Sequence, residues 1–184
     1  HDPDRARELL AEDGHDDGVQ VTFYVPEGGS GMLEPVAMST LIQADLARVG
    51  IDAEIETYEW NTYLDRVNAG LRDYAEMAAM AWMTNDPDTL PFLTLRSGAV
   101  PDEGGFNSGY FGNARVDELL EHARRATDPE KRASLYREMQ RIVHREAPWV
   151  FVAHWRQNAV TSARVSDFRL QPSFVLDLRG TRKD

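Results

Sequence analysis

The sequence predicts an α/β domain with a central mixed sheet that is flanked by helices. Residues 19–25 alternate between apolar and polar side chains, as expected for a strand with one buried face. Residues 35–49 then place their apolar side chains on one helical face, and residues 51–58 alternate again. Because a strand, a helix and a second strand joined by a connection of this length form a parallel crossover, we expect the two strands to be parallel.

Further helices and strands are expected on both sides of this crossover. A helix should begin at Asp2 and Pro3, because aspartate caps helices and proline suits the first helical turn. The apolar pattern then predicts, in chain order, a helix from Trp60 to about Gly70, a strand at 74–82, helices from Asn113 and from Asp128, and a last long strand at 149–160.

Two glycine-rich loops interrupt this pattern. Residues 26–31 lack a Gly-Lys-Ser or Gly-Lys-Thr ending, which disfavours a phosphate cradle and leaves a flexible connection as the default interpretation. Residues 97–113 form a loop of a length that is usually functional or mobile. The charge run at 121–125 is interpreted as a solvated helix face.

Length and composition limit the classes of function. The 184 residues suit one domain with a core of its own. The net charge of −11 argues against nucleic acid or an anionic membrane as the partner. The absence of cysteine excludes disulfides, thiolate metal sites and cysteine nucleophiles. No apolar run approaches the roughly 20 residues that are needed to span a bilayer.

The candidate site is the exit of the strand at 74–82. The strand ends in Trp82 and is followed by Asn85, Asp86 and Asp88 in a turn that contains a proline. In open α/β sheets ligands bind beyond the carboxyl ends of strands, where side chains become free to point outward. An ordinary solvated turn beneath a core tryptophan remains the alternative interpretation of these residues.

Catalytic and metal motifs find no support in the sequence. The five histidines show no i, i+4 spacing and no zincin pattern, so no metal site and no cofactor are expected. A Gly-x-Ser-x-Gly elbow is also absent. We therefore do not expect an enzyme, although a doubly wound enzyme or signalling domain with its site at Trp82–Asp88 remains the second hypothesis.

Several short motifs occur in a characteristic order. They are Leu41–Leu46, Tyr58–Leu64, Ala81-Trp82, Asp86-Pro87-Asp88, Asn107-Ser108-Gly109-Tyr110, Thr127–Arg132 and Ala147-Pro148-Trp149. Together they resemble the C-terminal lobe of the family 5 solute-binding proteins, the dipeptide, oligopeptide and nickel receptors of ABC importers. The resemblance implies a lobe of the type II periplasmic-binding-protein fold.

The resemblance also implies a domain organisation and a set of partners. Residues 1–161 would form the C-terminal lobe, and residues 162–184 would cross back toward an N-terminal lobe that lies outside this chain. The implied partners are a small-molecule or peptide ligand, that N-terminal lobe and the membrane subunits of an ABC importer. The implied location is periplasmic or otherwise extracytoplasmic, with a lipid anchor on the full-length protein left open.

The resemblance finally implies ligand contacts. Peptide-binding members place an aspartate just after the strand-end tryptophan to pair with the α-ammonium group of the ligand. Here Asn85 stands three residues beyond Trp82 and Asp86 follows, so either residue could take that role. Asp88, Asn107 and Tyr110 complete the implied set. Nothing basic lies between residues 22 and 48 to meet a ligand carboxylate, which favours a cationic peptide, sugar or other polar ligand.

Three expectations follow for these residues. Replacing Asp86 should weaken ligand binding and leave thermal stability nearly unchanged. Trp82 should have one face buried and one edge open to the ligand. The segment 165–178 alternates like a strand but follows an apparently complete domain. In the isolated chain, this segment should therefore either mediate self-association or be mobile.

Overall fold

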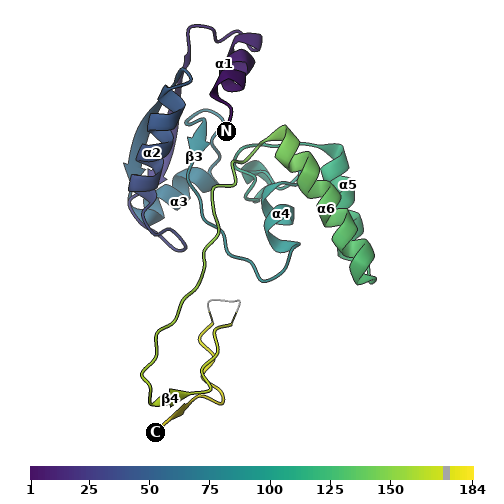
Figure 1. Cartoon of the computed structure of the whole chain (residues 1–184). Coiled ribbons are helices and arrows are strands. Elements are labelled where there is room, and N and C mark those ends of the chain that lie inside the picture. The colour runs from purple at the N-terminus through teal and green to yellow at the C-terminus, as the bar shows by residue number, and fades with distance from the viewer. Residues whose placement is uncertain (172–174) are drawn as a thin grey trace.

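The computed structural model describes residues 1–171 and 175–184 (Figure 1). The helices and strands are α1 (Pro3–Glu12), β1 (Val19–Pro26), α2 (Pro35–Ala47), β2 (Ile51–Tyr58), α3 (Trp60–Asn68), β3 (Met77–Ala78), α4 (Thr89–Thr94), η1 (Pro101–Glu103), α5 (Ala114–Arg125), α6 (Pro129–Glu146), β4 (Val165–Ser166) and β5 (Arg182–Lys183). The predicted α/β class and the order of its elements up to α6 are confirmed.

The main sheet has three strands in the order β2-β1-β3. β1 and β2 are parallel along their whole length, from Val19 opposite Ile51 to Pro26 opposite Tyr58. β3 is parallel to β1 on its other side, with Phe23 opposite Met77. The predicted crossover is therefore confirmed, whereas this sheet is parallel and not mixed.

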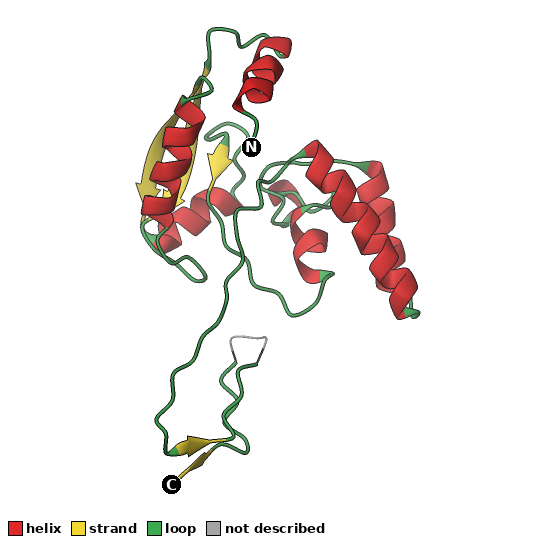
Figure 2. Ribbon diagram, in the orientation of Figure 1, coloured by secondary structure: helices red, strands yellow, loops and turns green. Residues whose placement is uncertain are grey.

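Helices cover both faces of this sheet (Figure 2). On one face, Phe23, Val25 and Ala53 form a buried cluster with Ile42 and Leu46 of α2. On the other face, a second cluster contains Tyr24, Tyr63, Val67 and Ala75, so that α3 packs there. This arrangement follows from the alternation of β1, whose neighbouring side chains point to opposite faces.

A helical hairpin of α5 and α6 forms a third buried cluster, beside the sheet (Figure 1). The side chains of Asn113 and Asp128 accept hydrogen bonds from the first backbone N–H groups of the two helices, as their positions predict. Ala147 ends α6 with a φ of 49° in the left-handed region.

The C-terminal part of the chain differs from the prediction. The expected strand at 149–160 is wrong: this segment contacts the α/β body through Trp149 and Trp155 but pairs with no strand of the described sheets (Figure 1). Most of its apolar side chains are open to solvent, with Val150 83% and Val160 100% exposed. An apolar pattern alone does not make a strand, because a strand needs a neighbour for its backbone hydrogen bonds.

Two other expected strands are shorter than predicted. The strand at 74–82 reduces to Met77–Ala78, which is where it pairs with β1. In the segment 165–178, Val165 and Ser166 pair antiparallel with β5, and Phe174 lies outside the described residues. Across the described part of the chain, we find no helix with the length and apolar character that membrane spanning requires.

Candidate functional site

The candidate site lies where the parallel strands of the main sheet end. Because β1, β2 and β3 run in the same direction, the segments that follow them leave the sheet at one edge. Trp82 follows β3 there and is 39% exposed. Its ring meets that of Phe106 edge to face, with 5.7 Å between centroids. Two half-exposed aromatic rings therefore stand at the strand exit.

The glycine-rich loop after β1 also belongs to this edge. A Cβ atom on Gly29 would lie 2.2 Å from Cε3 of Trp60, so the loop backbone lies directly on that ring. A Cβ atom on Gly31 would lie 3.1 Å from Cβ of Ala81, the neighbour of Trp82. The indole N–H of Trp155 donates to the Gly31 carbonyl at 2.8 Å. The loop is thus packed between aromatic residues and is not the plain connection that the sequence suggested.

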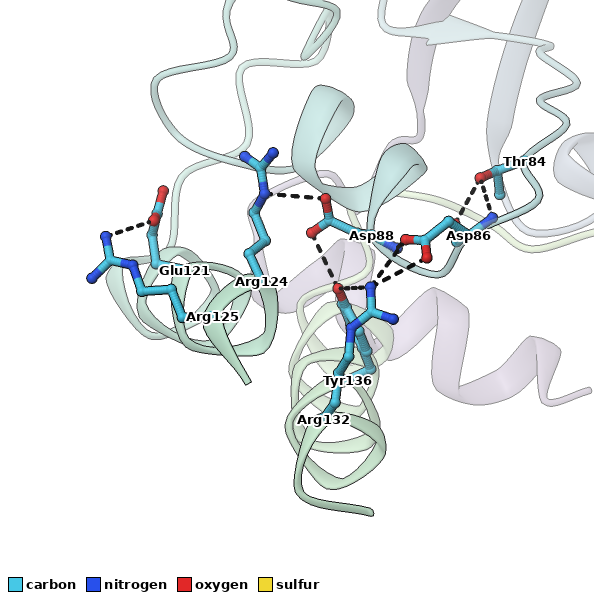
Figure 3. A network of polar contacts seen from close by, with 8 residues as sticks. All are labelled: Thr84, Asp86, Asp88, Glu121, Arg124, Arg125, Arg132 and Tyr136. Atoms are coloured by element: carbon cyan, nitrogen blue, oxygen red, sulfur yellow. Dashed lines mark hydrogen bonds and ion pairs between the residues drawn. The ribbon is translucent and has the colours of Figure 1, made fainter. Parts of the chain in front are cut away.

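The turn after Trp82 is held by its own side chains and by α6 (Figure 3). The backbone N–H of Asp88 donates to Oδ1 of Asp86 at 2.7 Å, which closes a local turn. Nη2 of Arg132 lies 3.1 Å from Oδ1 and 3.3 Å from Oδ2 of the same carboxylate. Asn85 is exposed in this turn.

Asp88 has a different environment from Asp86. The hydroxyl of Tyr136 donates to its Oδ1 at 3.1 Å, and Nε of Arg124 lies 3.2 Å from its Oδ2 (Figure 3). Both oxygens are therefore engaged by the α5–α6 hairpin, and the side chain is only 16% exposed, against 48% for Asp86. Of the two carboxylates, Asp86 is the one with surface left for another group.

The charged residues of the run at 121–125 lie on a solvent-exposed face of α5, as expected. Arg125 pairs with Glu121 on the helix surface, as expected. Arg124 instead turns to Asp88, and its guanidinium lies 3.7 Å from the ring centroid of Phe92. Its side chain is still 45% exposed, so it remains on the solvated face, but its partners come from a distant part of the chain.

Asn107 and Tyr110 organise the loop 97–113. Asn107 is buried, its amide donates to the carbonyls of Arg96 and Phe111, and its Oδ1 accepts the Phe111 N–H. Tyr110 has a φ of 53°, and the Arg72 guanidinium lies 3.8 Å from its ring centroid. These contacts hold the loop that carries Phe106.

The acid–base properties of the turn follow from these contacts. The Asp88 N–H, and then the Arg132 guanidinium, lower the pKa of Asp86 below its usual value. Burial, and then the charge of Asp88, raise the pKa of Tyr136 above its usual value. Within the described residues, no three His, Asp or Glu side chains are grouped so as to hold a metal ion.

The lowered pKa gives a pH-dependent prediction. Because the folded-state pKa of Asp86 lies below its unfolded value, its stabilising effect is present above the ordinary pKa of about 3.9 and is lost as the pH falls through the folded-state pKa. In an NMR titration, Arg132→Gln should raise the pKa of Asp86 but leave it below the ordinary value, since the Asp88 N–H remains. An unchanged pKa would show that the guanidinium does not face this carboxylate in solution.

Comparison with known proteins identifies the family. Residues 1–102 match the family described as bacterial extracellular solute-binding proteins, family 5 Middle. The match covers more than half of the chain, so the chain belongs to this family, whose members are non-enzymatic solute-binding proteins of ABC transport. The predicted family, the non-enzymatic character and the extracytoplasmic setting of the family are confirmed.

Individual relatives are similar over most of the chain. Di/tripeptide-binding protein 2 of Pseudomonas aeruginosa (strain UCBPP-PA14) is 32% identical over 100% of this chain and 34% of its own length. Heme-binding protein A of Haemophilus influenzae is 35% identical over 94% of this chain and 31% of its own length. The chain spans about a third of the length of these curated relatives.

Solved structures show the same fold. A dipeptide-binding protein from Pseudoalteromonas sp. SM9913 in complex with Met-Leu has a TM-score of 0.78 and 27% identity, over 100% of this chain and 36% of that one. An ABC transporter-associated periplasmic binding protein from Helicobacter pylori in complex with the peptide STSA has a TM-score of 0.66 and 31% identity, over 78% of this chain and 27% of that one.

Proposed function

We propose that this chain is the C-terminal ligand-binding lobe of a two-lobed periplasmic receptor that delivers peptides or related small polar solutes to an ABC importer. The observation that carries this proposal is the strand exit itself. Trp82 and Asp86 are each held from one side by neighbouring residues, yet both keep exposed surface at the same edge of the sheet. A rigid aromatic ring next to a carboxylate suits a ligand with an apolar part and an ammonium group.

Within this proposal the six candidate residues have two kinds of role. Trp82, Asn85 and Asp86 contact the ligand, because they are exposed in the turn after β3. Asp88 positions this turn against the α5–α6 hairpin. Asn107 and Tyr110 shape the loop that places Phe106 against Trp82.

The proposal of a second lobe is supported by the C-terminal part of the chain. Apolar side chains of 150–160, 170–171 and 175–178 are widely exposed; they include Val150, Phe151, Val152, Trp155, Val160, Leu170, Val175, Leu176 and Leu178. Runs of large exposed apolar side chains, such as 150–152 and 175–176, suit a contact with another body. The N-terminal lobe of the same protein would cover it, and residues 162–184 would cross back to that lobe.

Hydrogen exchange can test this two-lobed arrangement. In the chain alone, amides of 165–171 and 175–178 should exchange fast, or the chain should self-associate through this segment. In the two-lobed protein the same amides should exchange slowly. Slow exchange in a monomeric isolated chain, equal to that in the two-lobed protein, would contradict the crossing.

Tryptophan fluorescence tests the proposed site. Titrating the two-lobed protein with a dipeptide should change its emission, and Trp82→Phe should remove most of that change. Trp149→Phe is the matched control, because Trp149 packs against the α5–α6 core. A full signal change in Trp82→Phe together with its loss in Trp149→Phe would place the ligand elsewhere.

A further inference from the structure

The carboxylate of Asp86 is already paired within the protein. Nη2 of Arg132 lies 3.1 Å and 3.3 Å from its two oxygens, and the two residues are 46 positions apart in the sequence. The same nitrogen lies 3.5 Å from the hydroxyl of Tyr136, which in turn donates to Asp88. The guanidinium is therefore held in place by α6 and is not a mobile surface group.

The charges at the strand exit balance one another. Asp86 and Asp88 carry two negative charges, and Arg132 and Arg124 carry two positive charges at contact distance from them. A cationic ligand group that approaches Asp86 meets a carboxylate whose charge is compensated, and it also meets a like charge on Arg132.

The two arginines differ in what they can influence. Arg124 pairs with a carboxylate that is 16% exposed and lies over the ring of Phe92, so it fastens α5 to the turn. Arg132 pairs with a carboxylate that is 48% exposed, and its own side chain is 33% exposed. Arg132 is thus the arginine whose charge acts on the accessible part of the turn.

We propose that Arg132 is a specificity-determining residue of this lobe: as a built-in counter-ion of Asp86, it lowers the preference of the site for ligands with a free ammonium group. This inference rests on the function proposed above and refines its substrate class: the site should accept solutes that are neutral at the end facing Asp86 as well as ammonium-bearing ones. Replacing the guanidinium by a neutral group releases Asp86 to pair with an ammonium ion.

The test compares two ligands that differ only in this charge. Calorimetry on the two-lobed protein measures the Kd of a dipeptide with a free amino terminus and of its N-acetylated form. Arg132→Gln should raise the ratio of the acetylated to the free Kd by about tenfold, as expected for one hydrogen bond to a charged group. Arg132→Lys keeps the positive charge and should leave the ratio within about threefold of the wild type.

Two additional variants make the test specific. Asp86→Asn, added to Arg132→Gln, should return the ratio to the wild-type value, because the released carboxylate is gone. Arg137→Gln removes a positive charge from the same helix; Arg137 pairs with the exposed Glu130, and its loss should leave the ratio unchanged. If Arg132→Gln does not fold, Arg132→His replaces it: the ratio should then rise as the imidazole loses its charge between about pH 5.5 and 7, where the amino group of the dipeptide is still protonated.

The outcomes separate this inference from the proposed function. An unchanged ratio in Arg132→Gln, or a loss of binding of both ligands, would overturn the role of Arg132 and leave the lobe a binding lobe. A wild-type protein that binds neither form of any dipeptide would overturn the proposed substrate class, and the inference about Arg132 with it.

Discussion

Replacing Gly29 with alanine is expected to lower the free energy of unfolding by about 1–3 kcal/mol, the usual cost of overpacking. The added Cβ would lie 2.2 Å from Cε3 and 2.5 Å from Cζ3 of Trp60. That ring cannot move aside easily, because it stacks on Tyr63 at 5.9 Å and Tyr63 is completely buried. The loop must shift instead, and with it Gly31, which lies against Ala81. Chemical denaturation of the chain measures the loss.

Gly28→Ala is the matched control for this substitution. A Cβ atom at Gly28 meets nothing within 4 Å, so stability should stay within about 0.5 kcal/mol of the wild type. Equal stability of the two variants would mean that the loop does not rest on Trp60 in solution.

Replacing Asp86 with alanine in the two-lobed protein should weaken the binding of an ammonium-bearing ligand by about 1.5–3 kcal/mol. The ligand loses a charged acceptor, and Arg132 is left as an uncompensated like charge. Because Arg132 already shares the carboxylate, we expect the lower end of this range in the wild-type background and a larger loss in Arg132→Gln.

The same substitution should also lower the free energy of unfolding, by about 0.5–1.5 kcal/mol, because the Asp88 N–H loses its acceptor. This revises the expectation from the sequence that stability would hardly change. Glu130→Ala is the control, since it removes a carboxylate that is 91% exposed at the start of α6. Calorimetry that shows the stability loss without a change in affinity would make Asp86 a structural turn residue.

The parts of the fold that were predictable are those fixed by local patterns. The alternation of residues 19–25 and 51–58 and the helical pattern between them were enough to place the parallel pair β1–β2, although Leu41 of the expected apolar helix face is 71% exposed. The caps Asn113 and Asp128 likewise identified where α5 and α6 begin. In each case the sequence pattern that supports the prediction is local, although the β1–β2 pairing itself joins residues far apart in the sequence.

The parts that were not predictable depend on distant partners. The segment 149–160 has the pattern of a strand, but its backbone finds no neighbouring strand in the described sheets. The pairing of Asp86 with Arg132 joins residues 46 positions apart, and no periodicity encodes such a contact. For the loop at 26–31 a signal did exist: consecutive glycines allow a backbone to approach another group closely, here the ring of Trp60.

Native mass spectrometry of the two-lobed protein tests the central claim most directly. If this chain is a ligand-binding lobe, the protein purified under native conditions should carry a small polar solute or peptide that is released on denaturation, or should take up a dipeptide with one-to-one stoichiometry. A retained heme would keep the binding role and change the ligand class. A protein that retains nothing and keeps its bare mass in the presence of a dipeptide mixture would contradict the account.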